Sequence, residues 1–326
     1  MLPLGVILPT RNSRPYLERH LDALAPWLPL ARQVVVVDSF SIDGTLEFLR
    51  ANLKHANAAF LTHPPGLYQS WNFGIAQLKT DYTYISTIGE TITRPGLEHL
   101  VKHIQSLQTD LLVSPPAFRE AEEKPPPNVR WPSHDLLADL QIAAPQPLDK
   151  WTAFFYVCFN ALGASVNSLL GSSASNVYRT AILQKNPFPT EWGTAGDTAW
   201  SVANVFQAKW SVSPMVCSTY LFHPKTNGNS DELNDQLAVT LAQTADSLLK
   251  NELAQGLPNP VLAGLLPNLL NTLRGLREQH LALRRLRSGK RVPWLLNAQA
   301  WQARLARKRL EQKLAQIKTQ FLKLRG

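Results

Sequence analysis

The chain has 326 residues, of which 44% are hydrophobic and 17% charged, and its formal net charge is +9. This length can bury a sizeable core, and this composition excludes a largely disordered chain. The two cysteines, Cys158 and Cys217, have no CxxC spacing and supply neither a disulfide framework nor a zinc site, which fits a reducing compartment.

The first apolar run, in MLPLGVILPT, follows no basic segment and fits a strand better than a signal peptide. Two uncharged stretches, residues 151–178 and 253–273, are interrupted by Asn or Pro, so we expect no membrane-spanning helix. We therefore expect a cytoplasmic protein, with peripheral attachment to the inner face of the membrane as an open alternative.

Strand and helix patterns alternate over the first 115 residues. Strands are predicted over residues 5–10, 33–38, 58–62, 82–86 and 111–114, and helices over residues 16–24, 45–53 and 69–78 and from residue 95. The second strand, QVVVVD, is a run of β-branched residues without alternation, which is typical of a strand buried on both faces of a parallel sheet. The pattern predicts βαβ units and ligand binding at the carboxyl ends of the strands.

The rest of the chain divides into three parts. Residues 115–150 are rich in proline and are interpreted as a long loop or insertion, and residues 171–222 mix short strands with a helix. From about Asn229 the pattern is helical to the end. We therefore expect an α/β domain over residues 1–228, which would hold the ligand-binding edge of the sheet, and a helical region over residues 229–326.

The positive charge is concentrated in the helical region. Residues 271–326 hold fifteen Lys or Arg and two acids, a net charge of +13, and subtracting this from +9 leaves −4 for the other 270 residues. This asymmetry predicts an interaction with an anionic membrane surface or a protein partner. Nucleic acid is disfavoured because aromatic residues do not interleave with the basic ones.

An apolar stripe runs along the last predicted helix. Its members are spaced by four, three, four and three residues: Leu310, Leu314, Ile317, Phe321 and Leu324. Either this helix packs on its own domain, or it lies as a basic amphipathic helix on an anionic membrane with Trp294 and Trp301 as interface anchors.

Three acids, Asp38, Asp43 and Glu90, lie at or just beyond the ends of predicted strands, where ligands bind in parallel sheets. Asp38 ends the QVVVVD strand and either binds a nucleobase or ribose donor or has a second capping or solvated role. Asp43 caps the following helix. Glu90 lies in YISTIGETIT, in the turn after the fourth predicted strand.

Three ordered blocks, LPTRNS, VVVVDSFSIDGTLEFL and GLYQSWNFGIAQLKTDYTYISTIGETI, resemble the family 2 inverting glycosyltransferases. The resemblance covers about the first 100 residues and implies a GT-A fold, an α/β fold with a Rossmann-like, mostly parallel sheet, here with a helical C-terminal extension. It also implies a nucleotide-sugar donor, with the nucleotide bound by Pro9, Thr10, Asn12, Asp38 and Asn72.

The acid turn departs from most members of the family, which have a D-x-D triplet that holds a divalent cation against the diphosphate. Here the triplet is Ile88-Gly89-Glu90, which is in register with a subgroup that has a single acid in an N-S-G-D turn. The resemblance implies Mg²⁺ or Mn²⁺ at Glu90, bound directly or through water, and His223 as a further ligand. The alternatives are a solvated turn acid at Glu90 and a structural histidine at His223.

A later acid, Asp197 in EWGTAGDTAW, stands where the family places the general base of the inverting reaction. Its alternative role is to cap the helix that begins there, and Glu191 is a rival for the base. The stretch GSSASNVYR before it resembles the donor-sugar pocket of the family, with Gly171 and Ser172 as candidates.

The resemblance implies a hexosyl-transferring glycosyltransferase of polysaccharide biosynthesis. It would move a sugar, with inversion, from a nucleotide-diphosphate sugar to a glycan or a lipid-linked acceptor. The alternative is a catalytically inactive relative that binds a nucleotide-sugar or a glycan and serves as a scaffold in a glycan-assembly complex, an alternative that the missing first acid motivates.

Overall fold

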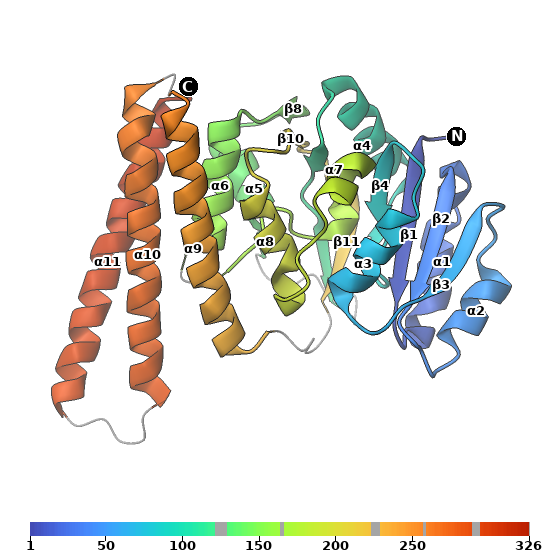
Figure 1. The fold of residues 1–326 in the computed structure, drawn as a ribbon, viewed down its shortest axis with the longest axis horizontal. Helices are drawn as coiled ribbons and strands as arrows, with labels where there is room; N and C mark the ends of the chain where they lie inside the picture. Colours follow the sequence, from blue (N-terminus) through green and yellow to red (C-terminus); the bar gives the residue numbers. More distant parts are fainter. Residues whose placement is uncertain (121–128, 164–165, 223–228, 257–258, 289–293, 326) are drawn as a thin grey trace.

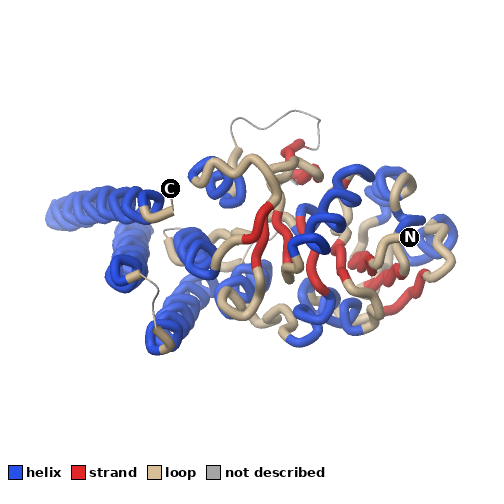
Figure 2. The backbone as a smooth tube through the Cα atoms, turned by 90° about the horizontal axis from the view of Figure 1, so that it is seen from above, coloured by secondary structure: helices blue, strands red, loops and turns tan. Residues whose placement is uncertain are grey.

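A computed structural model of the chain describes residues 1–120, 129–163, 166–222, 229–256, 259–288 and 294–325. An α/β body occupies most of the molecule, and three long helices stand at one end of it (Figure 1). Seen from above, the strands lie in the part of the molecule that contains the N-terminus, and the long helices lie at the opposite side (Figure 2).

The body is built on an eight-stranded sheet of order β3-β2-β1-β4-β9-β6-β10-β8. Its strands are β3 (Ala58–Thr62), β2 (Gln33–Asp38), β1 (Leu4–Thr10), β4 (Tyr82–Ile85), β9 (Asn176–Arg179), β6 (Leu111–Val113), β10 (Trp210–Val212) and β8 (Gln146–Pro147). β9 runs antiparallel to both of its neighbours and β8 antiparallel to β10, whereas the remaining pairs are parallel. The mostly parallel sheet confirms the predicted fold class.

Strand β2 shows why the sequence folds in this way. Its four valines, at residues 34–37, are all 0% exposed. Val34 and Val36 belong to one core cluster and Val35 and Val37 to another, because successive side chains of a strand point to opposite faces. The first cluster is covered by α1 (Leu17–Leu24), α2 (Thr45–Asn52) and α4 (Arg94–Leu107), and the second by α3 (Leu67–Ala76) and α7 (Thr180–Lys185).

A second sheet of order β5-β11-β7 lies beside the main one. It joins β5 (Thr91–Ile92), β11 (Ser218–Phe222) and β7 (Ala117–Glu120). The proline-rich residues 115–150, interpreted as a long loop or insertion, contain β7, α5 (Pro132–Asp139) and β8. Pro132 is compatible with a helix because it occupies the first turn of α5, where its missing N–H costs nothing.

The C-terminal region is helical, as expected, and consists of α9 (Asp231–Ala254), α10 (Pro260–Ser288) and α11 (Trp294–Lys323). Helices α10 and α11 form an antiparallel hairpin that extends beyond the body (Figure 1). Among the described residues, no helix is both long and apolar enough to cross a membrane.

The apolar stripe of α11 packs on the protein itself. Phe321 is 0% exposed and stacks on Phe155 of α6 (Lys150–Ala161), with ring centroids 4.0 Å apart. Lys318 pairs with Asp139, and Arg325 with Asp149 at 2.6 Å. Because Ile317 and Phe321 are buried in the core, the stripe packs on its own domain, and a contact of α11 with a membrane surface stays a prediction.

Candidate functional site

Four of the predicted site residues, Glu90, Gly171, Ser172 and Asp197, line one cavity of about 550 Å³. Its wall also includes residues of α3, Trp131 and the start of the α9 region. The cavity therefore gathers positions that lie more than 100 residues apart in the chain.

Residues 168–172 connect the parts of this cavity. The hydroxyl of Ser168 hydrogen-bonds the Asp197 carboxylate, and the hydroxyl of Ser172 donates to Oε2 of Glu90. One short segment thus contacts both acids, and a shift in it would move both together.

Asn176, the first residue of β9, fixes this segment to the sheet. Its side-chain amide donates to the carbonyls of Leu170, at 2.8 Å, and of Ser172, at 3.0 Å. Asn176 is completely buried. It lies in the stretch GSSASNVYR, but the sequence did not single it out as a supporting residue.

Glu90 lies in the turn between β4 and β5 and is 9% exposed. Burial raises the pKa of its carboxyl to about 7, and hydrogen bonds from Ser172 and from the backbone of Ala174 oppose that rise. These hydrogen bonds therefore do not fully offset the cost of burying the charged carboxylate. A cation or another positive group beside Glu90 would stabilise the charged form.

The residues around Glu90 are compatible with one carboxylate ligand for a divalent cation. No group of three or more His, Cys, Asp or Glu that could hold a metal occurs among the described residues. Mg²⁺ usually keeps several waters and binds through one or two carboxylates plus substrate phosphates, so a lone Glu90 satisfies that requirement. The other predicted ligand, His223, lies outside the described residues.

Asp197 lies in the first turn of α8 (Gly196–Ala203), where its Oδ1 accepts the N–H of Thr198 at 2.7 Å. Burial raises the pKa of Asp197, and hydrogen bonds from Thr198, Tyr68 and Ser168 act against this rise. A carboxyl with a raised pKa on a cavity wall has the properties of a general base.

The rival acid Glu191 is differently placed. It is exposed, accepts the N–H of Thr190 at 2.9 Å, and is absent from the cavity wall. The geometry therefore favours Asp197 over Glu191.

The expected nucleotide residues at the ends of β1 and β2 do come together. Pro9 pairs with Val37 and Thr10 with Asp38 in the parallel register. Asp38 is 1% exposed, and it accepts both the N–H of Ser41, at 2.9 Å, and the hydroxyl of Ser41, at 2.6 Å. Both carboxylate oxygens of Asp38 therefore bond within the loop after β2, which is the structural role that the sequence left open. Direct contact between Asp38 and a nucleotide would require this loop to move.

Asn12 closes the same network. It has a φ of 47°, its N–H donates to the hydroxyl of Ser41 at 2.9 Å, and its Oδ1 accepts the N–H of Ile42 at 3.0 Å. The loops after β1 and β2 are thereby held against each other. The nucleotide-binding role of these residues stays a prediction.

Asn72 has a structural task that the sequence did not reveal. Its amide donates to the carbonyl of Phe188 at 2.8 Å and accepts the N–H of Phe188 at 3.0 Å. Asn72 does not line the cavity, although Tyr68 and Trp71 of the same helix do. Tyr68 coincides with the tyrosine of the third sequence block, which was the available signal for it.

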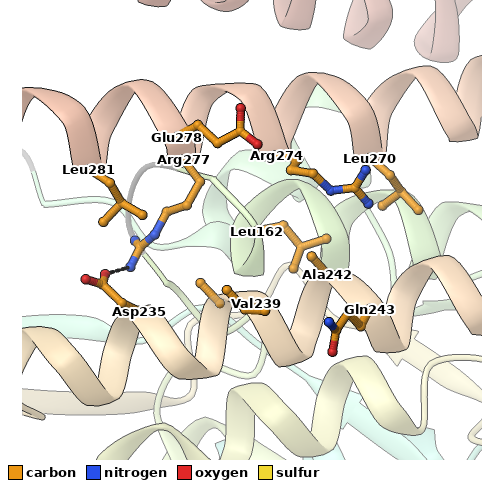
Figure 3. A pocket seen from close by; sticks show the side chains of 11 residues that line it. Leu162, Asp235, Val239, Ala242, Gln243, Leu270, Arg274, Arg277, Glu278 and Leu281 are labelled. Atoms are coloured by element: carbon orange, nitrogen blue, oxygen red, sulfur yellow. Dashed lines mark hydrogen bonds and ion pairs between the residues drawn. The ribbon is translucent and has the colours of Figure 1, made fainter.

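A second cavity, of about 370 Å³, lies between α9 and α10 (Figure 3). Its floor is apolar, with Leu162 and Val239 among its residues. On its rim Arg277 of α10 binds Asp235 of α9 at 2.6 Å. Its other acid is Glu278 of α10, and none of the predicted site residues that the structure describes lines this cavity, so it is not the candidate active site.

Residues 5–165 match the family described as Glycosyl transferase family 2. No match was found among curated proteins. The matched residues make up just under half of the chain. Membership of the whole chain in the family, and of the one-acid subgroup within it, stays a prediction.

Solved structures share the fold. TarS 1–349 of S. aureus in complex with UDP-GlcNAc has a TM-score of 0.58 at 17% identity, over 85% of this chain and 72% of that chain. The mannosyltransferase PcManGT from Pyrobaculum calidifontis, in complex with GDP-Man and Mn²⁺, has a TM-score of 0.50 at 16% identity, over 97% of this chain and 86% of that chain. At these identities the likeness shows the fold alone.

Proposed function

We propose that the protein transfers a hexose, with inversion, from a nucleotide-diphosphate sugar to a hydroxyl of a glycan or a lipid-linked acceptor in polysaccharide biosynthesis. The observation that carries this proposal is the shared cavity of Glu90 and Asp197, in which residues 168–172 contact both acids. The family match over residues 5–165 supports the same class of reaction.

Asp197 acts as the general base. It takes the proton of the acceptor hydroxyl while that oxygen forms a bond to the anomeric carbon and the bond from that carbon to the diphosphate breaks. Attack from the side opposite the diphosphate inverts the anomeric centre. The raised pKa of Asp197 brings its basicity closer to what this proton transfer needs.

Glu90 would supply one carboxylate to hold Mg²⁺ or Mn²⁺, which when bound would supply positive charge to offset that of the departing diphosphate. Ser172 holds the Glu90 side chain in place through its hydroxyl. Gly171 and Ser172 border the donor sugar, and Pro9, Thr10, Asn12, Asp38 and Asn72 are the proposed nucleotide region.

The basic face of α11 is the proposed contact with an anionic membrane surface or a protein partner, for a protein that works in the cytoplasm. This face consists of exposed cations: Arg304, Lys308, Arg309 and Lys313. Co-sedimentation with phosphatidylglycerol vesicles tests it. Charge reversal by R304E and K308E should abolish binding, and equal binding of the variant would remove the membrane from the proposal.

Turnover of UDP-GlcNAc or GDP-mannose in the presence of Mn²⁺ tests the transferase. We expect release of UDP or GDP by the wild-type protein and its loss in Asp197→Asn. Nucleotide binding without turnover of either donor, in the presence of acceptor glycans, would favour the inactive scaffold instead.

A further inference from the structure

Trp131 is a partly exposed aromatic side chain on the wall of the cavity that holds Glu90 and Asp197. It packs against two other rings, with centroid distances of 4.7 Å to Tyr220 of β11 and 5.3 Å to Phe118 of β7. The second sheet thus provides an aromatic support behind Trp131.

The position of the Trp131 ring depends on Gly171. A Cβ atom at residue 171 would lie 2.6 Å from Cε3 of Trp131, and the φ of 59° at Gly171 is one that L side chains rarely adopt. The backbone N–H of Trp131 also donates to Nδ1 of His134 at 3.2 Å. The ring is therefore held in place before any ligand arrives, which lowers the entropy cost of stacking on it.

The rest of the cavity wall is mixed, with Pro132 and Val166 beside polar side chains. Asn167, Ser168 and Asn234 provide amides and a hydroxyl. Of the described lining residues, only Glu90 and Asp197 are charged, and both are acids. A fixed aromatic face beside neutral hydrogen-bonding groups complements a ring that has apolar C–H bonds on one face and hydroxyls at its rim.

We infer that Trp131 forms a stacking platform for the neutral pyranose ring of a substrate. This inference rests on the proposed function and names the chemistry that the same cavity recognises. The ring belongs either to the donor sugar, beside Gly171 and Ser172, or to the acceptor sugar, beside Asp197, because residues 168–172 reach all of these positions.

Saturation-transfer NMR on the full chain tests this platform with three probes: UDP-GlcNAc with Mg²⁺, UDP with Mg²⁺, and methyl β-D-glucopyranoside. Trp131→Leu keeps apolar bulk but removes the ring, and Trp131→Phe keeps a ring. We expect Trp131→Leu to weaken binding of a sugar-bearing probe about tenfold, Trp131→Phe to retain it, and UDP binding to stay unchanged.

The two sugar probes separate the two sources. A loss confined to UDP-GlcNAc assigns the platform to the donor sugar, and a loss confined to the methyl glycoside assigns it to the acceptor. The matched control is Trp301→Ala, since Trp301 is 61% exposed on the distant helix α11. Thermal unfolding of each variant checks that it is folded.

The platform is overturned if folded Trp131→Leu binds both sugar probes as the wild type does, or if the wild-type protein binds neither. Donor turnover without any Trp131 effect would contradict the platform and leave the transferase intact. Trp131-dependent binding of the methyl glycoside without nucleotide binding would contradict the transferase and support the platform.

Discussion

The cavity between α9 and α10 and the cavity of the α/β body differ in how Asp235, Glu90 and Asp197 are compensated. Between α9 and α10, Asp235 faces Arg277 and Asp246 faces Arg274. In the cavity of the α/β body, Glu90 and Asp197 form no ion pair among the described residues and are held by hydroxyls and backbone N–H groups.

This difference distinguishes acids that stabilise the fold from acids that are available for a reaction. An ion pair stabilises the charged form of both partners, whereas uncompensated burial raises the pKa of a carboxyl. Both acids of the α/β cavity have raised pKa values. Such acids at the wall of a cavity are candidates for catalysis, and the paired acids between the long helices are candidates for stability.

The largest expected effect is on catalysis in the first cavity. Asp197→Asn preserves the shape of the side chain but removes the base, so kcat should fall about 10²- to 10⁴-fold. Initial rates of donor turnover at saturating substrate measure this. An unchanged kcat would exclude Asp197 as the base.

The equivalent change in the second cavity should affect stability. Asp235→Asn removes the acid that pairs with both Arg284 and the 12% exposed side chain of Arg277, so the free energy of unfolding should fall by about 1–3 kcal/mol. Urea denaturation measures it. The control is Asp231→Asn, because Asp231 is 77% exposed in its pair with Arg284 and its loss should cost little. Loss of donor turnover in a folded Asp235→Asn variant would contradict the assignment of Asp235 to stability and not to catalysis.

A smaller effect is expected for the proposed cation ligand. Glu90→Gln still accepts the Ser172 hydroxyl but binds a cation weakly, so affinity for UDP or GDP in Mn²⁺ should fall about tenfold, equivalent to about 1.4 kcal/mol. Calorimetric titration with and without Mn²⁺ measures it, with the exposed Glu191→Gln as control. Equal nucleotide affinity of the wild type with and without metal would argue against a cation at Glu90.

The smallest effect concerns the pH profile of kcat/KM. The base must be deprotonated, so kcat/KM should decline as the pH falls through the raised pKa of Asp197, above the ordinary value of 3.8. The hydrogen bond from Tyr68 lowers that pKa, so Tyr68→Phe should move the acidic limb to higher pH, by less than about one unit. A limb that moves to lower pH would contradict this assignment.

Much of the fold could be predicted because the residue pattern within a single strand or helix indicates that element. The valine run of β2 indicated a strand buried on both faces, and the three sequence blocks placed Glu90 in a turn after β4. Asp197, Gly171 and Ser172 could be proposed from motif order, and they share a cavity with Glu90.

The remaining features depend on contacts between distant segments, which no local pattern encodes. Asn72 binds Phe188, 116 residues away, and Trp131 packs on Gly171 and Tyr220 from a segment that resembled a proline-rich loop. The stripe of α11 was open to two interpretations, a membrane surface or a protein core, until its contact with Phe155 was known.

A crystal structure of the full chain with Mn²⁺ and UDP-GlcNAc or GDP-mannose is the most direct test of the central claim. We predict density for the diphosphate and the cation in the cavity of Glu90, Ser172 and Asp197. Density for the nucleotide-sugar in the α9–α10 cavity, or a diphosphate bound away from both Glu90 and Asp197, would contradict the claim.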